Sequence, residues 1–351
     1  MSADVGVGGT FPLDQDRNLA LELVRATEAA AIASARFVGH GDKNQVDQAA
    51  VDAMRPVLGS VGMRGVVVIG EGEKDEAPML FNGEEVGNGS DPAVDIAVDP
   101  VDGTTAAAKG LPDAVAVVGL SERGTMFDPG PCVYMDKLVV PEVAAEAVDP
   151  RAPTSEILAS VAGALGKAVK ELTVAVLDRP RHAQAVAEIR AAGAAVKFLL
   201  DGDVAGAIAV GQPGSGVDVL MGVGGTPEAV IAACALRCNG AAMFGRLHPR
   251  DEAERTAALE FGHDLDKVLT TRDLVWGDNV FFAATGVTDG SLLRGVRFDT
   301  QWVHTQSLSM RSRSGAIRTI ETRHHRTRSN LIEPGRNQDP SRASTANGTD
   351  G

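Results

Sequence analysis

Strand-like and helix-like segments alternate along residues 155–239, and this alternation narrows the choice of fold more than any other feature. Strands are expected at 172–177, 195–200 and 217–223, and helices at 155–166, 182–192, 203–210 and 227–239. Such alternation is typical of a sheet covered by helices. Upstream, helices are expected at 17–38 and 44–58, with strands at 65–69, 93–98, 114–120 and 133–140. Downstream we expect a helix at 252–262 and strands near 279–285, 302–310 and 316–323. The sequence therefore predicts an α/β protein.

A chain of 351 residues is long enough for two domains, at roughly 100 to 200 residues each. We predict a metal-binding and catalytic α/β domain over 16–148 and a second α/β domain over 149–325 that completes the substrate site. A loose N-terminus over 1–15 and a disordered tail over 326–351 would flank them, since the tail has almost no apolar residues. The last three strands could return to the first sheet or extend the second.

The charge of the chain argues against nucleic acid as a partner. There are 47 acidic and 33 basic residues, and only 4% of residues are aromatic. A phosphate-backbone binder is expected to be basic, and a base-stacking surface needs aromatic side chains. The acidity is concentrated in 71–102, which holds ten acidic residues and one basic residue, Lys74. Carboxylates at this density repel one another unless cations lie among them or the surface is fully solvated.

The cysteines and the apolar segments indicate the compartment. Cys132, Cys234 and Cys238 are an odd set without metal-binding spacing, and they are expected to be buried thiols. No segment approaches the 18 or so apolar residues of a membrane span, and no signal-peptide pattern is present in 1–13. We therefore expect a cytoplasmic protein without membrane contact.

The segment from Ala97 to Thr105 carries the most chemical information. An apolar strand is expected to end in Asp99, and Pro100 and Gly103 are then expected to turn the chain into a short helix. Asp99 and Asp102 could converge across this turn, and Thr104 could orient a metal-bound water. Two acids beside a helix start can hold a divalent metal that bridges to a phosphate. The alternative is an ordinary Asp-Gly-Thr turn.

Two further acidic residues follow predicted strands. Glu71 comes directly after the strand at 65–69, and Glu228 follows the strand at 217–223 through Gly224 and Gly225. Ligands of open α/β sheets gather at this edge. A solvated acidic loop would also explain Glu71, and capping would explain Thr226 and Pro227, with Thr226 as the N-cap of the helix.

The chain resembles the lithium-sensitive, metal-dependent sugar phosphatase superfamily, which is marked by an Asp-Pro-x-Asp-Gly-Thr turn and an upstream Glu. It resembles most closely the class II fructose-1,6-bisphosphatases of the bacterial GlpX family. The resemblance runs from about residue 18 to residue 323 and includes the blocks 41–44, 69–73, 75–79, 95–104, 134–137, 179–182, 201–203, 224–228 and 284–286. It implies a layered α-β-α-β-α fold with mixed sheets.

The resemblance also implies roles for individual residues. Thr104 would be the catalytic hydroxyl, assisted by Asp47 or, as second choice, Asp75. Two or more Mn²⁺ or Mg²⁺ ions would be held by Asp47, Glu71, Asp99, Asp102 and Glu228. The substrate would be contacted by Lys43, Asp102, Gly103, Thr104, Tyr134, Arg179, Pro180, Arg181, Asp201, Gly202, Asp203 and Gly225.

Several of these residues also have a plainer interpretation. Tyr134 could pack on an edge strand, Arg179 and Arg181 could be solvated, and Asp203 could simply cap the helix at 203–210. His182 is expected to start a helix rather than act as a base.

The implied reaction removes the 1-phosphate of fructose 1,6-bisphosphate, as in gluconeogenesis, and the implied assembly is a homo-oligomer. The alternatives are sedoheptulose-1,7-bisphosphatase activity (alone or in addition), an inositol-monophosphate-like phosphatase, and a non-catalytic sugar-phosphate sensor. Two arginines favour a bisphosphate, and the presence of Thr104 with all five carboxylates argues against a sensor.

Overall fold

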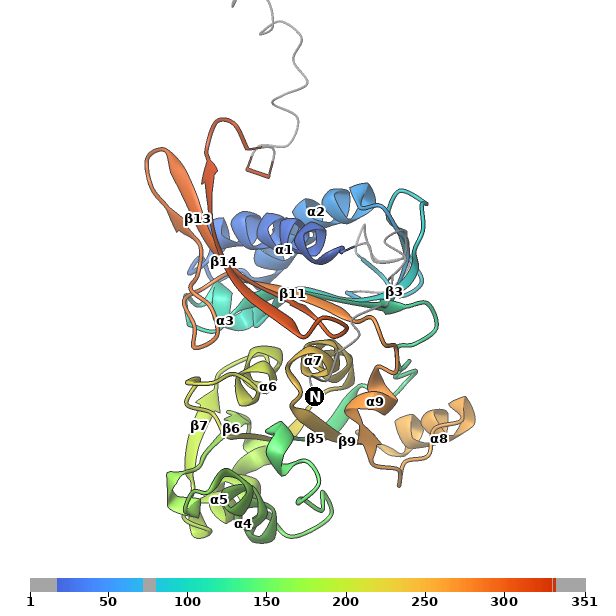
Figure 1. Cartoon of the computed structure of the whole chain (residues 1–351), viewed down its shortest axis with the longest axis vertical. Helices are drawn as coiled ribbons and strands as arrows, with labels where there is room; N and C mark the ends of the chain where they lie inside the picture. The colour runs from blue at the N-terminus through green and yellow to red at the C-terminus, as the bar shows by residue number, and fades with distance from the viewer. Residues whose placement is uncertain (1–17, 72–79, 330, 333–351) are drawn as a thin grey trace, which may run out of the picture.

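A computed structural model of the chain describes residues 18–71, 80–329 and 331–332 (Figure 1). The loose N-terminus predicted for 1–15 lies outside the described residues, as does the predicted tail from 333 onward. Within the described part, Ile332 packs against Ile32 and Val303. The backbone carbonyl of Ile332 also accepts a hydrogen bond of 3.0 Å from Arg36 Nη2.

The first sheet is mixed and contains strands from both ends of the chain. β1 and β3 are parallel, and the remaining pairs are antiparallel. In sheet order the strands are β12 (Arg297–Phe298), β13 (Trp302–Arg311), β11 (Phe281–Gly286), β4 (Val115–Glu122), β3 (Ala93–Asp102), β1 (Arg64–Ile69) and β2 (Glu85–Val86), and β14 (Ala316–His325) pairs with β13.

The second sheet is also mixed. β6 is parallel to β7 and β8, whereas β5 is antiparallel to both of its neighbours, β8 and β9. In sheet order the strands are β10 (Leu269–Thr270), β9 (Ala242–Leu247), β5 (Tyr134–Val140), β8 (Val219–Gly225), β6 (Thr173–Leu177) and β7 (Ala195–Leu199).

The helices form three layers that alternate with the two sheets (Figure 1). α1 (Ala20–Ser34) and α2 (Lys43–Ser60) share a core with the outer face of the first sheet. α6 (Val204–Val210) and α7 (Thr226–Asn239) lie between the sheets. α4 (Thr154–Leu165) and α5 (Ala183–Ala191) cover the far face of the second sheet. The expectation of a layered α/β fold with mixed sheets is confirmed. The remaining helices are α3 (Thr104–Ala108), α8 (Glu252–Phe261) and α9 (Thr271–Leu274).

The chain passes between the sheets twice. β5 lies in the second sheet although it precedes residue 149, and β11 to β14 return to the first sheet. Sheet membership therefore does not follow the boundary at 148/149. Of the two placements left open for the last three strands, the return to the first sheet is the one observed.

Two local predictions need correction. β3 does not end at 98 but continues to Asp102, with a register shift between Asp99 and Asp102 that accommodates Pro100 as a bulge. The sequence analysis did not predict β9, a short strand that contains Gly245, where a side chain would collide with the sulfur of Met135.

None of the described helices is long and apolar enough to cross a membrane.

Candidate active site

Parallel pairing of β1 and β3 brings two of the predicted acids to one edge of the first sheet. Ile69 is the register partner of Ala97. Glu71 comes two residues after Ile69, and Asp99 comes two residues after Ala97, so the two acids lie at the same end of the paired strands. Asp102 ends β3, and both Asp99 and Asp102 are buried. The carboxylate of Asp99 also accepts a 2.9 Å hydrogen bond from Val101 N–H. Strand register therefore brings Glu71 and Asp99 to the same edge of the sheet.

The other two predicted ligands come from helices. Asp47 lies in the first turns of α2, and Glu228 lies in the first turn of α7. Asp47 Oδ1 and Glu228 Oε2 are both buried, and neither has a hydrogen-bond partner among the described residues. A buried oxygen without a donor is costly unless a group outside the chain satisfies it. The two atoms are therefore open to a cation.

Burial and mutual repulsion act together on the five carboxylates. Burial, followed by the charges of Asp47 and Glu228, raises the pKa of Glu71 to about 7. The pKa of Asp99 is raised well above its usual value by burial, and then by Glu71, Asp102 and the other two acids. Interactions between charges weaken with distance, so the five groups lie near one another.

The remaining shifts have the same first cause. Burial raises the pKa values of Asp47, Asp102 and Glu228. Lys43 opposes the shift at Asp47, and Lys137 opposes it at Asp102 and Glu228. Within the described part of the chain, however, no three His, Cys, Asp or Glu side chains already stand at ion-binding spacing. The five carboxylates lie near one another and would have to move closer together to hold an ion.

Thr104 lies two residues after Asp102 in the sequence. Gly103 adopts the left-handed conformation (φ 94°) and is the N-cap of α3, so Thr104 is the first helical residue, with a half-buried side chain. The predicted partner Asp75 lies outside the described residues. Lys43 begins α2 four residues before Asp47 and is exposed.

Asp102 and Asp201 connect the two sheets. Asp102 Oδ2 accepts a 3.1 Å hydrogen bond from Val204 N–H, and Asp201 Oδ2 accepts one of 3.0 Å from Thr105 N–H. Each carboxylate therefore satisfies an unpaired donor at the start of the other segment's helix. Gly202 is needed at this crossing, because a Cβ there would lie 2.6 Å from Asp102 Oδ1.

Asp203 occupies the N-cap position of α6 but does not cap with its side chain. Its carboxylate instead binds Lys137, whose Nζ lies 2.7 Å from Oδ2 and 2.9 Å from Oδ1, and both residues are buried. Sequence reasoning gave Lys137 no role. The signal was available, because Lys137 alternates with Met135 and Val139 on the inward face of β5.

The predicted substrate residues from the second sheet lie along one edge. Arg179 Nη2 donates to Asp201 Oδ1 at 2.6 Å, and Pro180 and Arg181 follow it directly. Arg181 donates to the carbonyl of Val223 and lies over the ring of Tyr134, 5.3 Å from its centroid. β5 is a central strand, so the alternative of edge-strand packing for Tyr134 is wrong.

The turn into α7 differs from the predicted one. Gly225 is the N-cap, and Thr226 is the first helical residue. Thr226 Oγ1 has no hydrogen-bond partner in the part of the chain that the structure describes. Gly225 is pressed against the Glu228 carboxylate, so that a Cβ there would collide with Oε2. A glycine at position 225 therefore leaves room for the Glu228 carboxylate.

His182 has a structural role, as expected. Its Nε2 accepts a 2.9 Å hydrogen bond from Val223 N–H, which leaves Nδ1 as the donor to the Leu177 carbonyl at 2.8 Å. Both ring nitrogens are therefore occupied by backbone groups, and the ring ties β6 to β8.

Comparisons with known proteins identify the family of the chain. The family described as bacterial fructose-1,6-bisphosphatase, glpX-encoded, matches residues 17–324. The chain is 42% identical to the D-fructose 1,6-bisphosphatase class 2/sedoheptulose 1,7-bisphosphatase of Synechococcus sp. (strain JA-3-3Ab) and 43% identical to the fructose-1,6-bisphosphatase 1 class 2 of Escherichia coli (strain K12). Each match covers 88% of this chain and 96% of the relative. The chain therefore belongs to the glpX-encoded family of bacterial fructose-1,6-bisphosphatases.

Proposed function

We propose that the protein is a metal-dependent phosphatase that hydrolyses the 1-phosphate of fructose 1,6-bisphosphate to fructose 6-phosphate and phosphate, a step of gluconeogenesis. The observation that carries this proposal is the set of five neighbouring carboxylates, with Thr104 two residues after Asp102. The family and the names of its members support the substrate.

The carboxylates fit a hard divalent cation. Fructose-1,6-bisphosphatases are metal-dependent in general, and oxygen donors suit Mg²⁺ and Mn²⁺. We propose that Asp47, Glu71, Asp99, Asp102 and Glu228 hold two or more such ions. When bound, the metals would neutralise phosphate oxygens and make a bound water more acidic.

The remaining polar groups would position the substrate. Thr104, assisted by Asp47 or Asp75, would accept a hydrogen bond from the attacking water or donate one to it. Arg181 and Tyr134 would meet the second phosphate and the sugar, together with Lys43, Arg179, Asp201 and Asp203. Guanidinium groups hold phosphate in a fork, which suits a bisphosphate.

Sedoheptulose 1,7-bisphosphate is the second candidate substrate. The Synechococcus relative carries both activities in its name at 42% identity. The two substrates present the same phosphate to the metals, so one site could serve both.

We further propose a cytoplasmic homo-oligomer. Cys132, Cys234 and Cys238 are buried free thiols, which is compatible with a reducing compartment. Ile317 is 45% exposed on β14, where a second subunit could cover it. Light scattering in solution would measure the assembly.

The test is release of inorganic phosphate from fructose 1,6-bisphosphate with Mn²⁺ or Mg²⁺. We expect EDTA to abolish turnover and Thr104→Ala to reduce kcat by at least about 100-fold, the usual scale for a lost proton-transfer group. Thr154→Ala is the control, because Thr154 bonds the exposed Glu188 far from the carboxylates. An inactive wild type with both metals would refute the assignment, and sedoheptulose bisphosphate would then be tried.

A further inference from the structure

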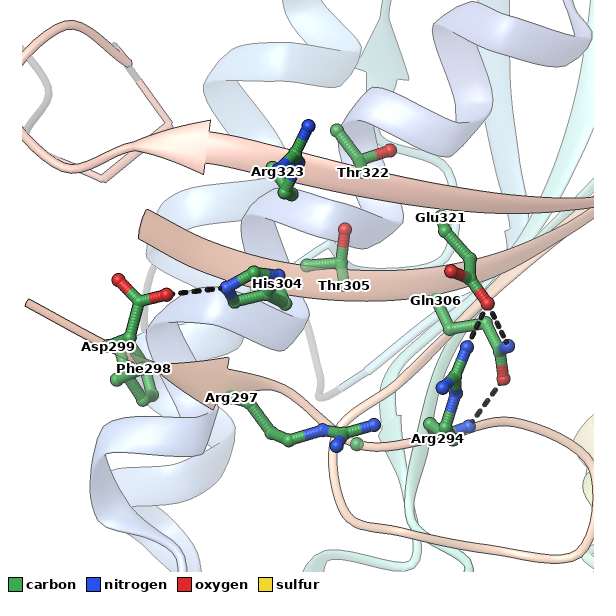
Figure 2. A pocket seen from close by; sticks show the side chains of 11 residues that line it. Arg294, Arg297, Phe298, Asp299, His304, Thr305, Gln306, Glu321, Thr322 and Arg323 are labelled. Atoms are coloured by element: carbon green, nitrogen blue, oxygen red, sulfur yellow. Dashed lines mark hydrogen bonds and ion pairs between the residues drawn. The ribbon is translucent and has the colours of Figure 1, made fainter. Parts of the chain in front are cut away.

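A cavity of about 550 Å³ lies at the end of the first sheet that is formed by β12, β13 and β14 (Figure 2). It is lined by β12, β13, β14 and the segment before β12, and none of the proposed metal or substrate residues lines it. Basic side chains come from each of these elements: Arg294, Arg297, His304 and Arg323.

Strand register puts three of these basic residues in one row. Arg297 on β12 is the partner of His304 on β13, and His304 is the partner of Arg323 on β14. Directly opposed residues of antiparallel strands point to the same face of a sheet. The row therefore places the guanidinium groups of Arg297 and Arg323 on the same face, on either side of the His304 ring.

The two acidic residues that line the cavity, Asp299 and Glu321, already have partners within the protein. Asp299 Oδ2 lies 2.8 Å from His304 Nε2, and Glu321 is paired with Arg294 and bonded by Gln306, as Figure 2 shows. Arg323 lies over the ring of Trp302, 5.7 Å from its centroid. Arg297 is exposed and has no ion pair or hydrogen bond among the described residues. Two guanidinium groups thus remain free to hold an anion.

Apolar surface adjoins this positive charge. Phe298 and Gly295 also line a neighbouring cavity of about 350 Å³. That cavity is lined mainly by apolar groups, among them Val38, Leu111 and Val296. A ligand could place an anionic group beside the arginines and a less polar body across Phe298.

We propose that this cavity is a second ligand site that binds an organic phosphomonoester, with the phosphate held by Arg297 and Arg323. A guanidinium pair matches the oxygens of a dianionic phosphate by forked hydrogen bonds. This site is separate from the catalytic one, because none of the proposed metal or substrate residues lines it and β11 and β4 lie between β13 and β3 in the sheet.

The test uses phenylphosphonate, which carries a dianion and an apolar ring and has no phosphate ester to hydrolyse. Calorimetric titration of the full chain with Mg²⁺ is expected to show a binding event that Arg297→Gln and Arg323→Gln each weaken by about tenfold or more, since a charged hydrogen bond is lost. Hydrogen exchange is expected to show ligand protection over 294–306.

Arg318→Gln is the matched control. Arg318 lies on β14 with its side chain on the opposite face and is exposed, so its loss removes the same charge from the same strand. We expect the Kd of Arg318→Gln for phenylphosphonate to stay within about twofold of the wild-type value. Equal weakening in Arg318→Gln, or identical binding in all variants, would overturn the proposal. Arg297 has no ion pair or hydrogen bond to lose within the described part of the chain, so Arg297→Gln is expected to fold normally, and circular dichroism checks this.

Discussion

Asp102 and Asp201 each accept a hydrogen bond from the helix start that follows the other. Asp102 Oδ2 lies 3.1 Å from Val204 N, and Asp201 Oδ2 lies 3.0 Å from Thr105 N. Asp102 ends a strand of the first sheet, and Asp201 follows a strand of the second. This exchange of two hydrogen bonds therefore fixes the position of the two sheets relative to each other at the site.

The exchange predicts a measurable effect of Asp201→Ala. The variant loses the bond to Thr105 N–H and leaves Arg179 without its carboxylate, so the free energy of unfolding should fall by about 1 to 3 kcal/mol. Activity should fall as well, because Thr105 adjoins Thr104. Denaturant unfolding measures the first effect. Asp264→Ala, which removes an exposed carboxylate bonded to Asp266 N–H, should cost clearly less; equal losses would contradict a special role for Asp201.

Lys137 and Asp203 form a buried ion pair, and its loss should be expensive. Lys137→Met leaves the Asp203 carboxylate buried without its partner and removes the cation that opposes the raised pKa of Asp102 and Glu228. We expect a loss of about 3 to 5 kcal/mol in unfolding free energy. Chemical denaturation provides the measurement.

A matched control for this variant is Lys167→Met. Lys167 binds Asp218 at 2.5 Å, but its side chain is 40% exposed. Exposed pairs contribute at most about 1 kcal/mol. If the two lysine variants lose the same stability, burial of Lys137 is not what makes its pair important.

Much of the fold was predictable because apolar periodicity reports local structure. The alternation from residue 155 to 239 predicted strands and helices within a few residues of those observed. The failures have local causes. Pro100 was taken as the end of a strand, whereas a bulge carries β3 past it, and Gly245 concealed the strand character of β9.

The candidate site was predictable only in part. Glu71 and Asp99 could be placed together because residues after parallel strands meet at one sheet edge. The pair of Lys137 with Asp203 and the exchange between Asp102 and Asp201 were not predictable, since they join residues 66 or more positions apart and depend on how the two sheets pack.

The facing carboxylates predict that divalent metal stabilises the fold. A ligand that binds only the folded state adds about 2.7 kcal/mol at a concentration 100 times its Kd, and here it would also relieve the repulsion among the acids. The melting temperature should therefore rise on addition of Mg²⁺ or Mn²⁺ to EDTA-treated protein. The same concentration of Na₂SO₄ controls for ionic strength. A melting temperature that does not respond to either metal would count against the metal site.

Gly225→Ala tests the position of Glu228 separately from the backbone. The φ angle of Gly225 is −64°, which alanine adopts readily, but the new methyl group would collide with the Glu228 carboxylate and displace it. We expect weaker metal binding, measured by calorimetry, and at least about tenfold lower activity, the scale seen when groups that support a metal site are lost. Gly163→Ala is the control, since a Cβ at this exposed position in α4 meets nothing within 4 Å. That change should leave metal affinity unaltered and add about 0.5 to 1 kcal/mol of stability, because alanine favours the helix. If Gly225→Ala binds metal as tightly as Gly163→Ala does, Glu228 is not a ligand.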